Sequence, residues 1–107
     1  MDNSKIKCVI QRPGQISEIA EIENTLEAFQ EIVGGYIEVM PLTAHLVLII
    51  NKESNLKGLN PNTYISTLCL VGTVIVTAVD TVDGEEFRSL TVHEIQVVRS
   101  WLLNETI

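Results

Sequence analysis

Residues 46–50 read LVLII and residues 73–80 read TVIVTAVD. A short, continuous apolar run is typical of a strand that is covered on both faces. The second stretch is the most β-prone of the chain, because Val, Ile and Thr fit a pleated surface. Both are therefore predicted to be strands, the first of them buried on both sides.

The N-terminal part predicts a β-hairpin. Lys5 to Gln11 (KIKCVIQ) alternates polar and apolar residues, as a half-buried strand does, and Gln15 to Ile22 alternates again. Pro13 and Gly14 between them are turn residues, since Pro presets φ and Gly accepts a positive φ. The isoleucine spacing in the second strand suggests a bulge. These isoleucines are Ile16, Ile19 and Ile22.

A first helix is predicted after this hairpin. Asn24 and Glu27 have the spacing of a capping box, with Asn24 as N-cap. Apolar residues then recur at three- and four-residue steps, and Gly34 and Gly35 end the helix. Glu23, Glu27 and Glu31 are expected along its exposed face. A strand over Tyr36 to Met40, broken by Pro41, follows.

A second helix closes the chain. Asp83 and Gly84 suit a tight turn that returns the chain through Glu86 to Leu90, and Thr91 with Glu94 forms another capping box. The apolar face of this helix is expected at Ile95, Val98 and Leu102. The order β-β-α-β-β-β-β-α predicts a single α+β domain over residues 1–107. We expect a mixed or largely antiparallel sheet of about five or six strands, with two helices packed on it.

Charge and composition exclude several classes of protein. Fourteen Asp and Glu against seven Lys and Arg give a net charge of −7, which opposes non-specific binding to nucleic acid. The apolar stretch Leu68 to Val79 is too short to cross a membrane as a helix. Cys8 and Cys69 lack metal or redox spacing, so buried thiols in a reducing, cytoplasmic compartment are expected.

No pattern for catalysis, metal binding or a cofactor stands out. His45 and His93 have no partner histidine at helical spacing, and no serine or cysteine lies in a nucleophile motif. Dinucleotide and Walker fingerprints are absent from the sequence. We expect a protein that is not an enzyme, holds no metal and needs no cofactor.

The first candidate site is the polar segment Asn51 to Asn62 (NKESNLKGLNPN), which we call the central loop. Its amides and lysines lie beside the most apolar part of the chain, where they suit recognition of a small polar or phosphorylated ligand. A solvated turn whose Asn side chains cap local backbone groups is the alternative. The candidate ligand-binding residues are Asn51, Lys52, Lys57, Asn60 and Asn62, with Arg12 as a further cation, Tyr36 to stack on a base and Thr73 to present its backbone N–H.

Arg99 and Trp101 form the second candidate. Arg and Trp are enriched at the centres of protein interfaces, so the last helix is a candidate contact between subunits of a homo-oligomer. The alternative is that Trp101 packs on the domain's own core while Arg99 is solvated.

The sequence contains the segments GGYIEV at 34–39, PL at 41–42, LVLI at 46–49, NKE at 51–53, LKGLNPN at 56–62, GT at 72–73 and SLT at 89–91. In these segments it resembles a family of small proteins, of unknown function, that is common in phages and mobile elements. The resemblance covers most of the chain and implies no catalytic residue. Small early phage proteins often disable host defences, either by sequestering a nucleotide signal or by capping a host enzyme. By analogy with such proteins, we expect this protein to act against a host defence.

Two functions are weighed from these observations. The first is a homo-oligomeric binding protein that sequesters a small anionic, nucleotide-like ligand. The second is an inhibitor of a host protein that acts through the acidic helix face. A small hydrolase acting on such ligands is a third, less favoured alternative.

Overall fold

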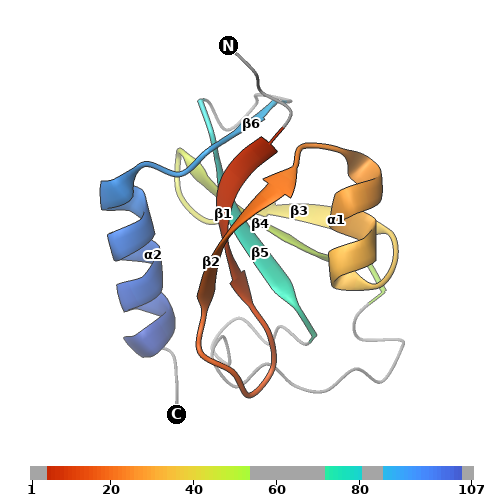
Figure 1. Ribbon diagram of the computed structural model, residues 1–107, viewed down its shortest axis with the longest axis horizontal. Helices are drawn as coiled ribbons and strands as arrows, with labels where there is room; N and C mark the ends of the chain where they lie inside the picture. Colours follow the sequence, from red (N-terminus) through yellow and green to blue (C-terminus); the bar gives the residue numbers. More distant parts are fainter. Residues whose placement is uncertain (1–4, 54–71, 81–85, 105–107) are drawn as a thin grey trace.

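The computed structural model describes residues 5–53, 72–80 and 86–104. It has the predicted α+β fold, with elements in the order β-β-α-β-β-β-β-α (Figure 1). The bounds are β1 Lys5–Gln11, β2 Glu18–Glu23, α1 Leu26–Val33, β3 Ile37–Pro41, β4 Leu46–Asn51, β5 Val74–Val79, β6 Phe87–Arg88 and α2 Val92–Asn104.

The strands form one antiparallel sheet in the order β2-β1-β5-β4-β3, and the short β6 also pairs with β5. The hairpins β1–β2 and β3–β4 therefore meet only through β5, which lies between them. All six residues of β4 and all six of β5 are buried, which confirms that the 46–50 run is covered on both faces.

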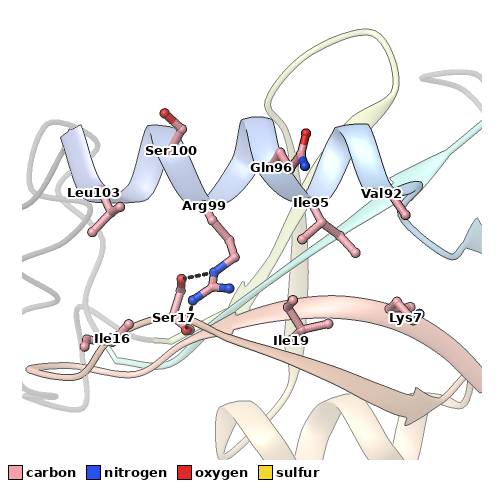
Figure 2. Close-up of a pocket in the computed structure, with 10 residues that line it drawn as sticks. All are labelled: Lys7, Ile16, Ser17, Ile19, Val92, Ile95, Gln96, Arg99, Ser100 and Leu103. Atoms are coloured by element: carbon pink, nitrogen blue, oxygen red, sulfur yellow. Dashed lines mark hydrogen bonds between the residues drawn. The ribbon is translucent and has the colours of Figure 1, made fainter.

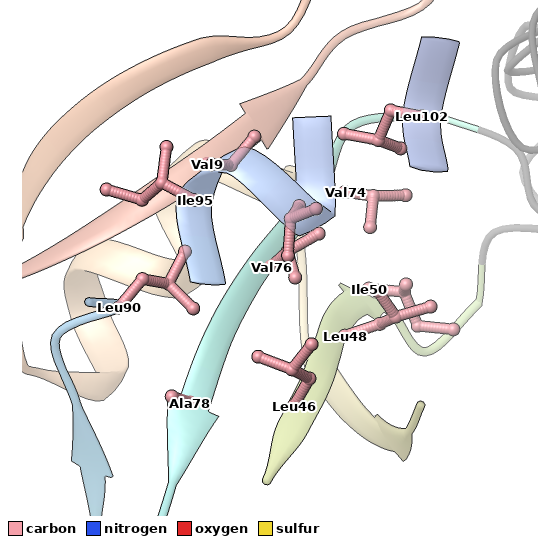
Figure 3. Packing of buried hydrophobic residues seen from close by; sticks show 11 residues of the cluster. Val9, Leu46, Leu48, Ile50, Val74, Val76, Ala78, Leu90, Ile95 and Leu102 are labelled. Atoms are coloured by element: carbon pink, nitrogen blue, oxygen red, sulfur yellow. The ribbon is translucent and has the colours of Figure 1, made fainter. Parts of the chain in front are cut away.

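Each face of the sheet carries one helix and one apolar core. Phe29 and Val33 of α1 pack against β1 and β4 residues such as Ile10 and Ile49. On the opposite face, α2 closes the core that Figure 3 shows. Its inward side chains are Ile95, Val98 and Leu102, the apolar face predicted for this helix. We call these three residues the buried stripe of α2.

The β1–β2 hairpin is regular. Its register runs without interruption from the pair Lys5 and Glu23 to the pair Ile10 and Glu18, so the predicted bulge is wrong. Ile16 precedes β2, while Ile19 and Ile22 take opposite faces of it, which explains their spacing without an inserted residue. Gly14 has φ 71° in the turn, as predicted from the Pro-Gly pair.

The segment after β6 inserts beside β1. The N–H of Leu90 donates to the carbonyl oxygen of Lys7 at 2.9 Å, and the N–H of Lys7 donates to Ser89 Oγ at 2.8 Å. β5 pairs with β1 through Val74 to Val76 and with β6 through Ala78 and Val79. The predicted turn at Asp83 and Gly84 lies outside the described residues.

Helix α1 begins one residue later than the sequence indicates. Thr25 is the N-cap, because its Oγ1 accepts a hydrogen bond from the Ala28 N–H at 3.1 Å. The predicted N-cap, Asn24, instead donates from Nδ2 to the Phe87 carbonyl oxygen at 3.4 Å. Glu23 consequently belongs to β2 and not to the helix. Gly34 ends α1 with φ 85°, as predicted.

The strand ends at Pro41, one residue later than predicted. Pro41 is the last residue of β3 and pairs with Val47. β3 is an edge strand, where the missing N–H of proline leaves no ladder bond unmade.

The predicted capping box fixes the start of α2. The Thr91 N–H donates to Glu94 Oε1 at 2.9 Å, and the Glu94 N–H donates to Thr91 Oγ1 at 3.1 Å. Arg88 donates from both terminal nitrogens to the two Glu94 oxygens, at 2.8 and 3.0 Å, and from Nε to Asp80 at 3.1 Å. This fork ties the helix to β6.

We expect Glu94→Gln to lower the free energy of unfolding by about 1 kcal/mol at neutral pH. The hydrogen bonds from Arg88 lower the pKa of Glu94 to about 2, from an ordinary value of 4.5. The stabilisation is therefore complete above the ordinary value and is lost as the pH falls towards 2. Urea unfolding of both proteins across this range should show the difference shrinking. Glu86→Gln, at an exposed position, is the matched control, and a pH-independent difference would contradict the assignment.

Candidate functional site

An open groove of about 600 Å³ lies between α2 and the β1–β2 hairpin. Figure 2 shows α2 as one wall and the hairpin as the other, with Arg99 reaching across between them. Small-molecule sites usually have volumes of about 300 to 1,000 Å³, so the size is that of a ligand site. The lining residues are Lys7, Ile16, Ser17, Ile19, Val92, Ile95, Gln96, Arg99, Ser100 and Leu103.

The walls of the groove are aliphatic and open to solvent. Ile16 and Val92 expose 72% and 73% of their surface, Leu103 exposes 62% and Ile19 exposes 46%. Single exposed apolar residues are ordinary, but several around one concavity mark a surface that binds something.

The helical wall comes from a second stripe on α2. Its residues recur at steps of four, three and four, beside the buried stripe, and so share one side of the helix. These residues are Val92, Gln96, Arg99 and Leu103. On the other wall, Ile19 pairs with Val9 and therefore points to the same side of the sheet as α2.

The charged residues that line the groove are both cations. Among the described residues, Lys7 and Arg99 line the groove and no carboxylate does, although the whole chain has a net charge of −7. Lys7 has Glu21 as its cross-strand partner, so that carboxylate offsets part of its charge. None of the described carboxylates forms an ion pair with Arg99. Arg99 is therefore the cation of the groove whose charge is less offset by its described neighbours.

Ser17 holds the Arg99 side chain in place. Nε of Arg99 donates to Ser17 Oγ at 3.3 Å, and Nη2 donates to the Ser17 carbonyl oxygen at 3.3 Å. Ser17 is buried, whereas Arg99 is partly exposed. The guanidinium is thus fixed across the groove while its remaining donors stay accessible.

The predicted ligand residue Asn51 has a structural position. It is buried, its Nδ2 donates to the Val33 carbonyl oxygen at 3.1 Å, and its Oδ1 accepts from the Glu53 N–H at 2.8 Å. The side chain therefore completes the C-terminal turn of α1 and starts the following turn. This is the capping alternative that the sequence left open, now seen for Asn51.

Four other predicted residues gather at one end of the sheet. The pairing of Gln11 with Val74 places Arg12 and Thr73 there, and the Lys52 N–H donates to the Tyr36 carbonyl oxygen at 2.8 Å. Arg12 forms an ion pair with Glu18, which neutralises its charge locally. None of the four lines the groove. The remaining candidates, Lys57, Asn60 and Asn62, lie outside the described residues.

The structure separates the two predicted interface residues. Trp101 is partly buried and packs against the core beneath α2, together with Met40 and Leu42. Arg99 lies on the side of α2 that faces the hairpin, in the groove.

Potential metal ligands and the thiols are the other reactive groups of the chain. Within residues 5–53, 72–80 and 86–104, no three His, Cys, Asp or Glu side chains come together as a metal site would require. Cys8 is a free, buried thiol, and burial raises its pKa to about 11, which keeps it protonated at neutral pH. Cys69 lies outside the described part. None of the helices in that part is long and apolar enough to cross a bilayer.

A family model for a domain of unknown function, DUF3846, matches residues 6–102. The chain belongs to the DUF3846 family. A comparison with curated proteins gives no match, and a comparison with solved structures gives none either. Since the matched residues run from β1 to α2, all the lining residues of the groove except Leu103 lie within the DUF3846 match.

The groove of this DUF3846 chain was missed by sequence reasoning, although part of the signal is visible. Val92 and Leu103 fall outside the buried stripe yet are apolar, and Arg99 lies between them at helical spacing. Nothing local indicates that Ser17 meets Arg99, because 82 positions separate them.

Proposed function

We propose that this protein is a non-enzymatic binding protein that sequesters a small anionic ligand in the groove between α2 and the β1–β2 hairpin. One observation carries the proposal: in an acidic chain, the described residues that line this apolar groove include two cations and no carboxylate. An anion gains the attraction of Arg99 there, in a concavity whose aliphatic walls lower the local dielectric.

The polar groups of the groove are few, as in small-molecule sites, where a handful of polar atoms orient a ligand held mainly by apolar contact. Gln96 and Ser100 supply such atoms beside Arg99. Preorganisation by Ser17 favours affinity, because the arginine side chain is already ordered before the ligand arrives.

The proposed setting is the cytoplasm of a host cell, where a phage-type protein would remove a small anionic signal molecule, nucleotide-like or otherwise, from solution. The resemblance to proteins of phages and mobile elements supports this setting. A homo-oligomer is proposed with it.

We expect Arg99→Ala to weaken binding of such an anion at least tenfold, since it removes a groove cation that pairs with none of the described carboxylates. Isothermal titration with a panel of linear and cyclic nucleotides and small organic carboxylates and phosphates checks this. Arg12→Ala is the matched control, because Arg12 is a partly exposed arginine at the turn of the hairpin that is paired with Glu18 and does not line the groove. No heat across the whole panel would remove the proposal. An effect of Arg12→Ala alone would move the site to the end of the sheet.

The exposed carboxylates support a second candidate, inhibition of a host protein. Glu27 and Glu31 lie one turn apart on α1, and Glu23 ends β2; all three are exposed. Such a surface associates with a basic partner rapidly and in a salt-sensitive way. Capture from host lysate at low but not high salt, lost in the double variant Glu27→Gln and Glu31→Gln, would favour this candidate.

A further inference from the structure

We propose that the ligand is an aliphatic oxyanion: a flexible apolar chain that carries one carboxylate or phosphate group, with the oxyanion on Arg99 and the chain along Ile19, Ile95 and Val92. This inference rests on the proposed function and narrows the class of ligand that the same groove takes.

The first argument is the orientation of the Arg99 fork. Ser17 accepts from Nε and Nη2, whose N–H groups lie along one edge of the planar guanidinium. Among the described residues, Nη1 has no hydrogen-bond partner, and Nη2 keeps a second N–H. These two N–H groups point away from the side chain in parallel, and their spacing matches the two oxygens of a carboxylate or a phosphate.

The second argument is the chemistry of the walls. The apolar lining consists of isoleucine, valine and leucine, and none of the ten lining residues is aromatic. Protein sites that hold nucleobases commonly stack them on aromatic side chains. Branched aliphatic walls instead offer van der Waals contact without a preferred ring geometry. A flexible aliphatic ligand can adapt its conformation to such walls.

The third argument is the layout along the groove. Figure 2 shows Ile19, Ile95 and Val92 on one side of Arg99, and Ile16 with Leu103 on the other. Arg99 follows Val92 by seven positions of helix, so the apolar path from the guanidinium to the start of α2 is roughly 10 Å long. This length suits a medium aliphatic chain. Lys7 lies towards the far end of this path (Figure 2). Because its cross-strand partner Glu21 offsets part of its positive charge, the ligand does not need a second full negative charge at this end.

The test titrates the full chain with octanoate, octyl phosphate, acetate, octanol and a nucleotide monophosphate. Octanoate or octyl phosphate should bind at least tenfold more tightly than acetate, which lacks the chain, and than octanol, which lacks the charge. The two octyl anions also separate a carboxylate ligand from a phosphate ligand.

Two variants locate the binding. Arg99→Lys keeps the charge but loses the fork, so it should weaken octanoate binding about tenfold, whereas Arg12→Lys should not. Val92→Asn changes an exposed residue at the start of α2 and is expected to fold. It should weaken octanoate binding and leave the weak acetate binding unchanged.

The outcomes distinguish this inference from the proposed function. Nucleotide binding that depends on Arg99, without octanoate or octyl phosphate binding, overturns the aliphatic ligand and keeps the anion site. Octanoate binding that Arg99→Lys and Val92→Asn both leave unchanged also overturns it. Failure of every anion in both panels removes the proposed function as well.

Discussion

The Leu48→Ala variant is expected to lose about 3 kcal/mol of unfolding free energy. Leu48 lies in the middle of β4, is completely buried, and packs in the core that α2 covers. Truncation removes apolar contact and leaves a cavity, because strands on both sides and a helix above prevent the site from collapsing. Chemical denaturation monitored by circular dichroism measures the loss.

Leu26→Ala is the control with the same chemical change. Leu26 begins α1 and exposes 52% of its surface, so its truncation should change stability by less than about 0.5 kcal/mol. Equal losses in the two variants would contradict the burial of β4 and with it the central position of this strand.

The Asn51→Ala variant is expected to lose about 2 kcal/mol. It removes both hydrogen bonds of a buried amide and leaves the Val33 carbonyl oxygen at the end of α1 and the Glu53 N–H without their partners. The cost of burying polar groups without partners dominates this loss. Thermal and urea unfolding of the variant would measure it.

Asn24→Ala serves as the reference for this change, because Asn24 is only partly buried and makes a single, longer hydrogen bond. Its expected loss is below about 1 kcal/mol. Anion binding by folded Asn51→Ala should equal that of the wild type. If Asn51→Ala is fully stable but no longer binds an anion, the side chain is a ligand-binding group and its structural assignment is wrong.

Most of the fold was predictable because it depends on local signals. The buried run at Leu46 to Ile50, the Pro-Gly turn and the left-handed Gly34 each specify one backbone conformation with few alternatives. The capping box of Thr91 and Glu94 marked the start of α2 in the same way. These features are decided within a few residues of sequence.

The errors occur where two local solutions have similar energy. Asn24 and Thr25 are both good N-caps, and the structure selects Thr25 because Asn24 reaches Phe87 on β6. The isoleucine spacing in β2 suggested a bulge, but Ile16 lies before the strand and does not need to follow its alternation. Contacts that are distant in sequence decided both cases.

The candidate site was less predictable than the fold. The amides and lysines of the central loop stood out in the sequence by composition, yet Asn51 proved to complete a helix end. The groove depends instead on a helix and a hairpin from opposite ends of the chain, and its guanidinium is positioned by Ser17. The residue type of Arg99 favours a subunit contact in the sequence, whereas the structure places the residue in the groove. The residue type alone does not indicate which surface of the helix the side chain faces.

The position of β5 has a consequence for how the protein is made. Translation produces β1, β2, α1, β3 and β4 before Val74 appears, so both hairpins exist for a time without the strand that joins them. The edges of β1 and β4 that will receive β5 are apolar, and an open apolar edge recruits strands from other molecules. A chain truncated before Val74 would keep these edges open permanently, and we expect it to aggregate during synthesis instead of retaining a partial fold.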